Sequence, residues 1–365
     1  MERDLALFNC YPAASQKNLV SAAETMMDFQ ANPEIYQHKS DLYDQRKPHS
    51  IYYQKDPSNL KKPGALLIEL GILTEHRNKV FALWVKNPRS FKEKKPLKYR
   101  LVVVNKKVDS ETIAQCQRIT QVAKEFQKTY VLPKYYPSTT FANKPINILK
   151  FYPHGDLLIQ SKLQTNRKDL FVSLLDLITK IKVLHSNGYA HVDIKPENIF
   201  IDAHPRASHG ICILGDLETL RKVDDRSNSG GTTAYLSPEF ALDEVHDPRT
   251  ADIWGLGCIL FFIYSDKKPL FQKILKSYEI DSSRENELKK YLDLLKSLNT
   301  SEEKFLFGAH LRAIIAKHIP PALQPLLIKM LNPDPKRRIS AEQVLALMNT
   351  ISPKIFSPPL DVIEE

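Results

Sequence analysis

Residues 191–200 read HVDIKPENIF, a run in which three polar side chains stand at short, fixed intervals between apolar neighbours. Asp193 supplies a carboxylate, Lys195 an ammonium group and Asn198 a neutral amide. Phosphoryl transfer uses these three kinds of group: an acceptor for the proton of the incoming hydroxyl, a cation near the moving phosphate, and an oxygen ligand for magnesium. The run therefore predicts an enzyme that transfers phosphate.

Further motifs follow this run along the chain. An apolar stretch at 211–214 leads into Asp216, as expected of a strand that ends on a metal ligand. Together the motifs resemble those of the eukaryotic-type protein kinases, serine/threonine type, over residues 185–345. In that family the first run is H-R-D-x-K-x-x-N, so Val192 stands where an arginine is expected. In chain order, the other motifs are GDLE at 215–218, GTTAY at 231–235, SPE at 237–239, DIWGLG at 252–257 and DPKRRIS at 334–340.

The resemblance implies an α+β, bilobal protein kinase fold with a small β-rich N-lobe and a larger helical C-lobe, and 365 residues suffice for both. Residues 1–60 carry no motif of the family and form an N-terminal extension of unknown role, in which 19–29 have helical apolar spacing. We expect the N-lobe at 61–150, the C-lobe at 151–350 and a C-terminal tail at 351–365. The pattern predicts strands at 65–68, 80–85, 99–104, 131–136 and 146–151, and helices at 111–128, 170–184, 253–264, 288–298 and 322–331.

A lysine that holds the α- and β-phosphates is expected at the end of a buried N-lobe strand. Lys106 fits, because strand side chains alternate and Val104 then lies on the same face above the adenine. Lys107 is the competitor if the register shifts by one residue. The partner of the lysine is expected to be Glu125 on the following helix, although a solvated helix face is the alternative for this glutamate.

The glycine-rich loop is thin. Residues 70–80 keep one glycine, Gly71, where the family has three, and intruding side chains would weaken the backbone cradle for phosphate. The resemblance nevertheless implies ATP as the nucleotide. The residues it assigns to the ATP site are Val80, Val104 and Lys106, Leu149 as gatekeeper, Lys150 and Tyr152 at the hinge, Asp156 at the ribose, and Phe200 below the pocket.

By the same resemblance, Asp193 is the base or orienting acceptor for the substrate hydroxyl, and Lys195 neutralises charge on the transferring phosphate. Asn198 and Asp216 would hold Mg²⁺, a hard cation that prefers oxygen ligands. Lys106 and Glu125 complete the catalytic set. The residues expected to support the substrate segment and the helical core are Thr232, Glu239, Asp252 and Arg338.

Two departures from the family pattern bear on regulation and metal binding. Val192 removes the arginine that receives an activation-loop phosphate, so the hydroxyls of Ser227, Ser229 and Thr233 are expected to be dispensable. Glu218 replaces the permissive glycine that follows the magnesium aspartate, which puts the freedom of that turn in doubt.

Positive charge is concentrated between positions 86 and 107, which hold nine Lys or Arg and one acid, Glu93, in a chain of net charge +10. A solvated loop is the plainer interpretation. The alternative is a surface at 86–100 for a polyanion, such as an inositol phosphate, an acidic phospholipid or an acidic protein. No aromatic interleaving or nucleic-acid motif favours nucleic acid.

The chain has no run of 18 or more apolar residues, and its N-terminus lacks the order of a signal peptide. Its four cysteines have no metal-binding spacing, and two lie inside apolar runs, which favours thiols in a reducing compartment. We therefore expect a cytoplasmic location. Kinases of this type also occur as bacterial effectors delivered into host cells, which gives host cytoplasm as a second expectation.

The function predicted from these residues is a serine/threonine protein kinase that uses ATP and Mg²⁺ and is not controlled by activation-loop phosphorylation. One alternative is a weakly active pseudokinase that serves as a binding scaffold, favoured by the thin glycine loop and Glu218. The other is a transferase of the same fold that acts on a lipid or small molecule, and the near-complete substrate segment at 231–239 argues against it.

Overall fold

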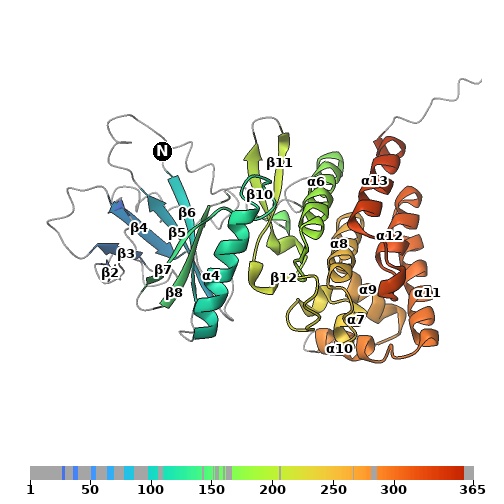
Figure 1. Cartoon of the computed structure of the whole chain (residues 1–365). Coiled ribbons are helices and arrows are strands. Elements are labelled where there is room, and N and C mark those ends of the chain that lie inside the picture. Colours follow the sequence, from blue (N-terminus) through green and yellow to red (C-terminus); the bar gives the residue numbers. More distant parts are fainter. Residues whose placement is uncertain are drawn as a thin grey trace, which may run out of the picture. The chain divides into compact units, whose positions relative to one another are not determined.

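The computed structural model describes the chain at 27–28, 36–39, 51–54, 64–69, 78–85, 98–105, 110–141, 144–150, 152, 156–158, 161, 167–204, 207–265, 267–280 and 286–356. Side chains are described at 110–135, 149–150, 152, 156–158, 161, 169–202, 211–265, 267–280 and 286–351. Two compact units divide the chain, Met1–Gly155 and Asp156–Glu365, and each is described by itself (Figure 1).

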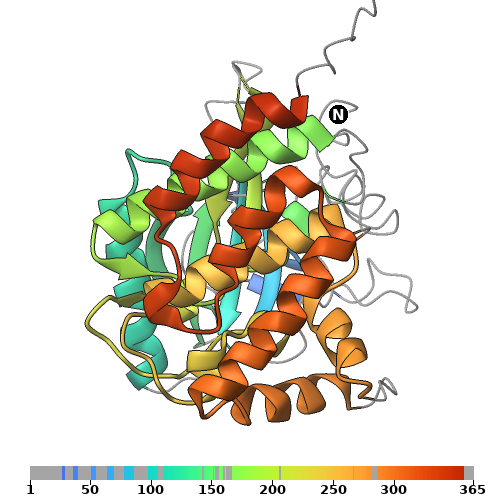
Figure 2. The same cartoon turned by 90° about the vertical axis from the view of Figure 1, so that its right-hand side faces the viewer.

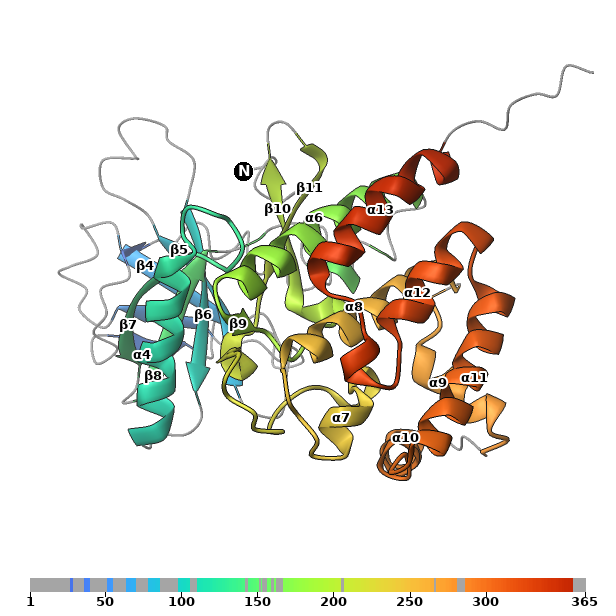
Figure 3. The same ribbon diagram turned by 45° about the vertical axis from the view of Figure 1, so that its right-hand side comes forward.

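In the described part of the first unit, eight strands form one sheet in the order β2-β3-β4-β5-β6-β8-β7, with β1 beside β4. The pairs along this path are antiparallel, and β1 runs parallel to β4. Helix α4 (Ser110–Glu125) packs on β7 and β8 (Figure 3) and buries Cys116, Ile119 and Val122 at helical spacing. The strands are β1 Met27–Asp28, β2 Tyr36–Lys39, β3 Ile51–Gln54, β4 Gly64–Glu69, β5 Asn78–Val85, β6 Lys98–Asn105, β7 Tyr135–Phe141 and β8 Lys144–Lys150.

Two details of this sheet correct the sequence prediction. The strand expected at 131–136 begins only at Tyr135, because Val131 and Leu132 are buried in a turn without joining the ladder. The helix expected at 19–29 is wrong at its end, where Met27–Asp28 form β1. In addition, β1, β2 and β3 lie in the predicted N-terminal extension and pair into this sheet, which the apolar pattern had not indicated.

The second unit is mainly helical in its described residues, with short strands near its start. Its strands are β9 Tyr189–Ala190, β10 Ile199–His204, β11 Ala207–Leu214 and β12 Arg221–Lys222. Its helices are α6 Arg167–Ser186, α7 Pro238–Ala241, α8 Arg249–Tyr264, α9 Leu270–Ser277, α10 Glu287–Lys296, α11 Ser301–His318, α12 Gln324–Met330 and α13 Ala341–Phe356. Short 3₁₀ turns η3 Pro196–Asn198, η4 Leu217–Thr219, η5 Thr233–Tyr235, η6 Pro321–Leu323 and η7 Pro335–Arg337 connect them.

Helix α8 is the centre of this unit. Its residues from Ala251 to Tyr264 are all buried, as expected for a helix that is apolar on every face. Trp254 and Phe261 are completely enclosed, and Trp254 stacks at 6.4 Å between ring centroids on Phe307 of α11. Helix α13 lies along α6 (Figure 2), and α12 packs on α8. The run at 191–200, called the catalytic run below, is bonded to this helical core.

Helix α11 was not predicted, because its apolar residues point in more than one direction. Phe307 is buried, whereas Phe305 is 67% exposed and Leu306 53% exposed, so the sequence shows no single apolar stripe. Its start does carry a signal: the Thr300 hydroxyl and the Glu303 side chain form a capping box. No described helix is long and apolar enough to span a membrane.

Candidate active site

A hairpin brings the catalytic run and the second aspartate motif together. Strand β10 starts directly after Asn198 and β11 ends directly before Gly215, and Ile199 pairs with Leu214 at the base of the hairpin. The Gly215 amide donates to the Asn198 carbonyl at 2.7 Å. Two residue types that lie far apart in sequence, the amide of Asn198 and the carboxylate of Asp216, thus belong to adjoining turns.

Asp193 is the hub of a small hydrogen-bond network. Lys195 Nζ donates to Asp193 Oδ2 at 2.8 Å and to the Thr232 hydroxyl at 2.7 Å. Asn198 Nδ2 donates to the same Asp193 Oδ2 and to the Asp193 carbonyl, both at 2.9 Å. The other carboxylate oxygen, Oδ1, is buried and has no hydrogen-bond partner among the described residues. One oxygen of Asp193 is therefore held by the protein and the other is left for a hydroxyl donor.

The protonation state of Asp193 follows from these contacts. Burial by itself would raise its pKa, but the Lys195 charge, the Lys195 hydrogen bond and the Thr232 hydroxyl outweigh burial and hold the pKa below its ordinary value of 3.8. The group is consequently ionised at neutral pH. A carboxylate of such low pKa is a weak base, so its main contribution is to accept and orient a hydroxyl hydrogen.

Asn198 and Asp216 offer the oxygens of a magnesium site. Because Asn198 Nδ2 is committed to Asp193, the amide oxygen is the atom left to face a metal ion. Asp216 has a left-handed backbone (φ 54°) and an exposed carboxylate. Protein atoms packed around that carboxylate nevertheless raise its pKa. The Asp193 carboxylate raises it further, because two like charges then lie close together. One amide and one carboxylate oxygen fit Mg²⁺, which binds few protein ligands together with phosphate.

The backbone of the catalytic run is anchored to α8 by one buried carboxylate. Asp252 Oδ1 accepts from the Val192 amide at 2.6 Å, and Oδ2 accepts from the His191 amide at 2.9 Å. Oδ2 also lies 2.8 Å from His185 Nε2 of α6, and His191 Nε2 lies 2.7 Å from the Gly215 carbonyl. Asp252 thus ties the catalytic run and α6 to one point of α8.

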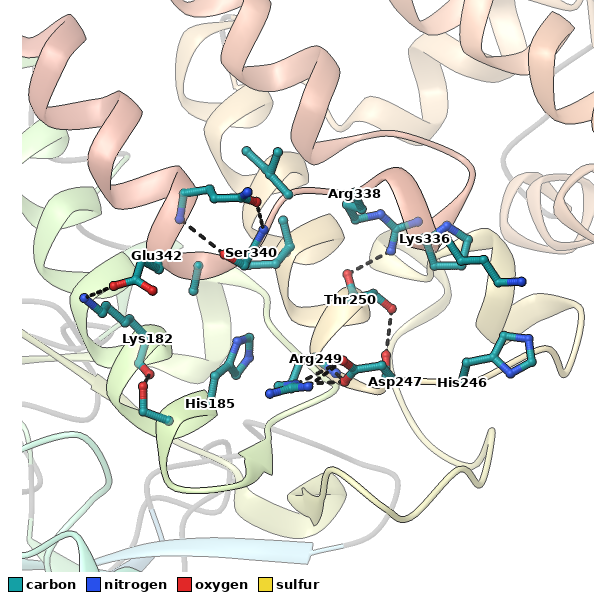
Figure 4. A pocket seen from close by; sticks show the side chains of 16 residues that line it. Lys182, His185, His246, Asp247, Arg249, Thr250, Lys336, Arg338, Ser340 and Glu342 are labelled. Atoms are coloured by element: carbon teal, nitrogen blue, oxygen red, sulfur yellow. Dashed lines mark hydrogen bonds and ion pairs between the residues drawn. The ribbon is translucent and has the colours of Figure 1, made fainter.

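A buried ion pair between Glu239 and Arg338 links α7 to the residue that follows η7. Arg338 donates to both carboxylate oxygens of Glu239, at 2.5 and 2.9 Å, and its guanidinium lies 5.1 Å from the Trp254 ring centroid. Arg338 also donates to the Thr250 carbonyl at 2.8 Å (Figure 4). The pair is bidentate and fully enclosed, so it fixes α7 relative to α8 and η7.

The cavity drawn in Figure 4 lies beside this pair and not at the catalytic run. It measures about 550 Å³ and is lined by residues of α6, of the start of α8 and of the start of α13. Arg249 and Asp247 pair with each other at its rim, at 2.8 Å between Nη2 and Oδ2. Of the predicted site residues, the lining includes Arg338 and none of Asp193, Lys195, Asn198 and Asp216.

The residues assigned to the ATP site are divided between the two units. Lys106 and its competitor Lys107 lie outside the described residues, directly after the end of β6. Glu125 is the last residue of α4 and its side chain is exposed. The remaining positions are Val80 in β5 opposite Val103, Val104 in β6 opposite Ile146, buried Leu149 and half-buried Lys150 at the end of β8, buried Tyr152, and Asp156, which forms a bridge with Phe200 of β10.

Two residues that sequence reasoning missed contact the segments around the catalytic run. His185 was not recognised as a partner of Asp252, because only the packing of α6 on α8 brings them together. Arg221 was not singled out either, although it is 5% exposed and donates to Ser227 and Ser229. These two residues lie in the loop at 223–231, called the activation loop below. It stands among exposed charged residues in the sequence, so no local pattern distinguishes it.

Comparison with known proteins shows the family of the chain. The protein kinase domain family matches residues 74–348. The chain is 30% identical over 165 residues to the serine/threonine-protein kinase RUNKEL of Arabidopsis thaliana, covering 41% of this chain and 12% of that protein. It is 28% identical over 216 residues to a probable myosin light chain kinase of Dictyostelium discoideum, covering 55% and 43%. It is 24% identical over 250 residues to CBL-interacting serine/threonine-protein kinase 15 of Arabidopsis thaliana, covering 67% and 53%.

The fold and the family match define the class of protein kinase domains, for which a bilobal α+β fold is general. The chain belongs to the protein kinase domain family, on a match that covers most of its length. It spans less than two thirds of the length of each of these relatives.

Proposed function

We propose that this chain is an active serine/threonine protein kinase that transfers the γ-phosphate of ATP to protein hydroxyls with the help of Mg²⁺. The observation that carries the proposal is the network of Asp193, Lys195, Thr232 and Asn198, in which Lys195 and Asn198 hold one oxygen of an ionised Asp193 and leave the other unbonded.

In the proposed mechanism, Asp193 Oδ1 accepts the hydrogen of the substrate hydroxyl and aims the oxygen at the γ-phosphorus. Lys195, held by Asp193 and Thr232, would neutralise charge on the transferring phosphoryl group. Asn198 and Asp216 would hold Mg²⁺, which would supply positive charge to neutralise the phosphate oxygens. The leaving ADP takes the electron pair of the broken P–O bond, and the hydroxyl proton passes toward Asp193.

Serine or threonine is the proposed acceptor. The lysine two residues after the aspartate, bonded to Thr232, is typical of the serine/threonine type, and relatives of this chain carry that description in their names.

Nucleotide binding is proposed to use the residues that the resemblance assigns, which the chain carries in both units. Lys106, paired with Glu125, would hold the α- and β-phosphates, Val80 and Val104 would cover the adenine, and the hinge positions Leu149, Lys150 and Tyr152 would face the base. Asp156 would bind the ribose and Phe200 would close the pocket. The single glycine of the 70–80 loop should give a weaker nucleotide affinity than a loop with three.

Control by activation-loop phosphate is not part of the proposal, because Val192 has no group that can bind a phosphate. Alanine at Ser227, Ser229 and Thr233 together should therefore leave transfer within a few-fold of wild type. Residues 86–97 of the proposed polyanion surface lie outside the described residues, and 98–100 open β6. A response to inositol phosphates or acidic lipid vesicles would support that surface.

Incubation of the purified chain with Mg²⁺ and γ-labelled ATP tests the proposal. Label in serine or threonine of an acceptor protein is the expected result. Nucleotide binding without transfer would favour the scaffold alternative, supported by the thin glycine loop and Glu218. Label only in a lipid or small molecule would favour a transferase of the same fold that acts on such a molecule.

A further inference from the structure

Arg221 is a buried cation for which the proposed mechanism has no role. It opens β12, where it pairs with Ala190 of β9, and Ala190 directly precedes the catalytic run. Only 5% of Arg221 is exposed, and its guanidinium lies 5.9 Å from the Phe240 ring centroid. A buried guanidinium is costly unless its donors are satisfied, so the groups around it show what holds it in place.

Oxygens of the activation loop surround this guanidinium. Nη1 donates to the Ser227 carbonyl at 2.6 Å and to the Ser227 hydroxyl at 2.7 Å, and Nη2 donates to the Ser229 carbonyl. Nε donates to the Thr219 carbonyl at 3.1 Å. Three of these four acceptors are backbone carbonyls, which are present whatever the side chains of the loop carry. These contacts with backbone carbonyls bind the loop to the core.

The bound loop leads directly to the catalytic residues. Only Gly230 and Gly231 separate Ser229 from Thr232, and both glycines have positive φ (93° and 87°), so the chain turns sharply there. A Cβ on Gly230 would lie 2.6 Å from the Thr219 methyl carbon, which shows how closely the loop passes over η4. Thr232 then accepts from Lys195. Fixing the Ser229 carbonyl therefore restricts where Thr232 can lie.

Thr219, whose carbonyl accepts from Arg221, is also bonded to the catalytic run. The Thr219 hydroxyl donates to the His191 carbonyl at 2.8 Å, so η4 is bonded to the residue just before Val192. Arg221 consequently joins three segments: η4 through Thr219, the loop through Ser227 and Ser229, and β9 through backbone pairing. Val192 supplies no donor to this junction.

We propose that Arg221 is a positioning residue that holds the peptide-substrate segment in its working position without a phosphate on the loop. This inference rests on the proposed kinase function and deepens it by naming what takes over from loop phosphorylation. Arg221 is not among the residues proposed to bind the nucleotide and it holds the loop that leads to Thr232, so its loss should impair the use of a peptide acceptor more than the chemistry on ATP.

The test compares Arg221→Ala and Arg221→Lys with Arg226→Ala, which removes the same charge from an exposed position in the same loop. With a degenerate serine/threonine peptide library as acceptor, kcat/KM of Arg221→Ala should fall about tenfold or more, mainly through KM. ATP hydrolysis without acceptor should stay within about threefold of wild type, and Arg226→Ala should match wild type in both. Peptide kinetics of Arg221→Ala equal to those of Arg226→Ala would overturn the proposal.

Two further measurements keep the result interpretable. Phosphatase-treated wild type, shown by mass spectrometry to carry no phosphate at 225–233, should keep its activity. A loss of about tenfold, restored when Ser227 or Ser229 is rephosphorylated, would make Arg221 a phosphate receptor and refute the inference. Hydrogen exchange at 225–232 should be faster in Arg221→Lys, which folds with the charge retained, than in Arg226→Ala. Hydrogen exchange does not need catalysis. It therefore separates an error in the role proposed for Arg221 from an error in the proposed kinase function.

Discussion

At the scale of single residues, Val192 combines an unusual backbone with an unusual side chain. Its φ of 71° is left-handed, a conformation that a β-branched residue adopts at a cost on the order of 1–3 kcal/mol. The amide is held by Asp252, and the side chain packs in an apolar cluster with Ala190, Phe240 and Val245. The surroundings therefore impose this backbone and accept an apolar group.

Restoring the family arginine should consequently be harmful. Val192→Arg would place a second guanidinium beside the Phe240 ring already faced by Arg221, in a site that is 7% exposed. We expect a melting temperature several degrees lower, because a buried charge without a partner costs on the order of a few kcal/mol. Thermal unfolding of the purified variant measures this. Adding Ser229→Asp should recover part of the loss, and a more stable single variant would contradict the argument.

Loss of either catalytic carboxylate should stop transfer and preserve the fold. Asp193→Asn keeps the shape of the side chain but removes its charge, so the rate should fall about a hundredfold or more. Asp216→Ala removes an exposed group from a turn, with little effect expected on stability. Single-turnover rates and melting curves of both variants provide the check. Activity close to wild type in either one would remove that residue from the site.

At the scale of elements, α8 supports the catalytic run through a close approach that only glycine permits. A Cβ on Gly255 would lie 2.6 Å from the Ile194 carbonyl oxygen, a backbone atom that cannot move without moving the run itself. On another face of α8, a Cβ on Gly257 would lie 2.8 Å from Leu331 Cδ2, which is the end of a flexible side chain.

The two glycines therefore make a matched pair of variants. Gly255→Ala should lower both kcat and the melting temperature, whereas Gly257→Ala should lower the melting temperature less and leave kcat near wild type. Steady-state kinetics and calorimetry on the pair decide this. Equal losses of kcat would show that the contact with Ile194 has no bearing on catalysis.

The end of β6 offers a second prediction at this scale. By strand alternation we expect Lys106 to share the face of Val104, so Lys106→Met should abolish transfer and Lys107→Met should not. Side-by-side assays with labelled ATP measure the difference. The opposite outcome would mean that the register of the lysine is shifted by one residue.

At the scale of the whole molecule, the Glu239–Arg338 pair joins residues 99 positions apart. Burial by itself would raise the pKa of Glu239, but the Arg338 charge and hydrogen bonds outweigh burial and hold the pKa below its ordinary value of 4.5. A lowered folded-state pKa gives stability that is fully present above 4.5 and is lost as pH falls toward the folded-state value.

The stability of Glu239→Gln should lack this dependence on pH. At pH 7 the variant should be less stable by about 3–5 kcal/mol, because Arg338 is left buried without its counter-charge. Below about pH 4.5 the wild type also loses this contribution, so the two unfolding free energies should converge. Denaturant unfolding from pH 7 to pH 3.5 measures the difference. A difference that stays constant with pH would show that the carboxylate charge does not stabilise the pair.

Much of the architecture followed from local pattern. The strands predicted at 65–68, 80–85 and 99–104 lie within β4, β5 and β6, and the helices at 170–184 and 253–264 lie within α6 and α8. These segments have strong apolar periodicity or uniform apolarity, which a single sequence displays. Segments with blurred periodicity, such as α11 and the strands of the N-terminal extension, could not be predicted, because their apolar residues meet partners that only the fold supplies.

The sequence by itself determined the chemistry: which groups the catalytic run carries, their order, and the absence of an arginine at Val192. These properties reside in residue types at short spacing, which do not depend on distant contacts. Only the tertiary structure decided that Asp193 keeps one oxygen free, that Asp252 binds the backbone of Val192, and that Arg221 is buried against the loop. Each of these depends on long-range packing around α8 and β12, where burial removes competing water and gives a particular hydrogen bond its effect.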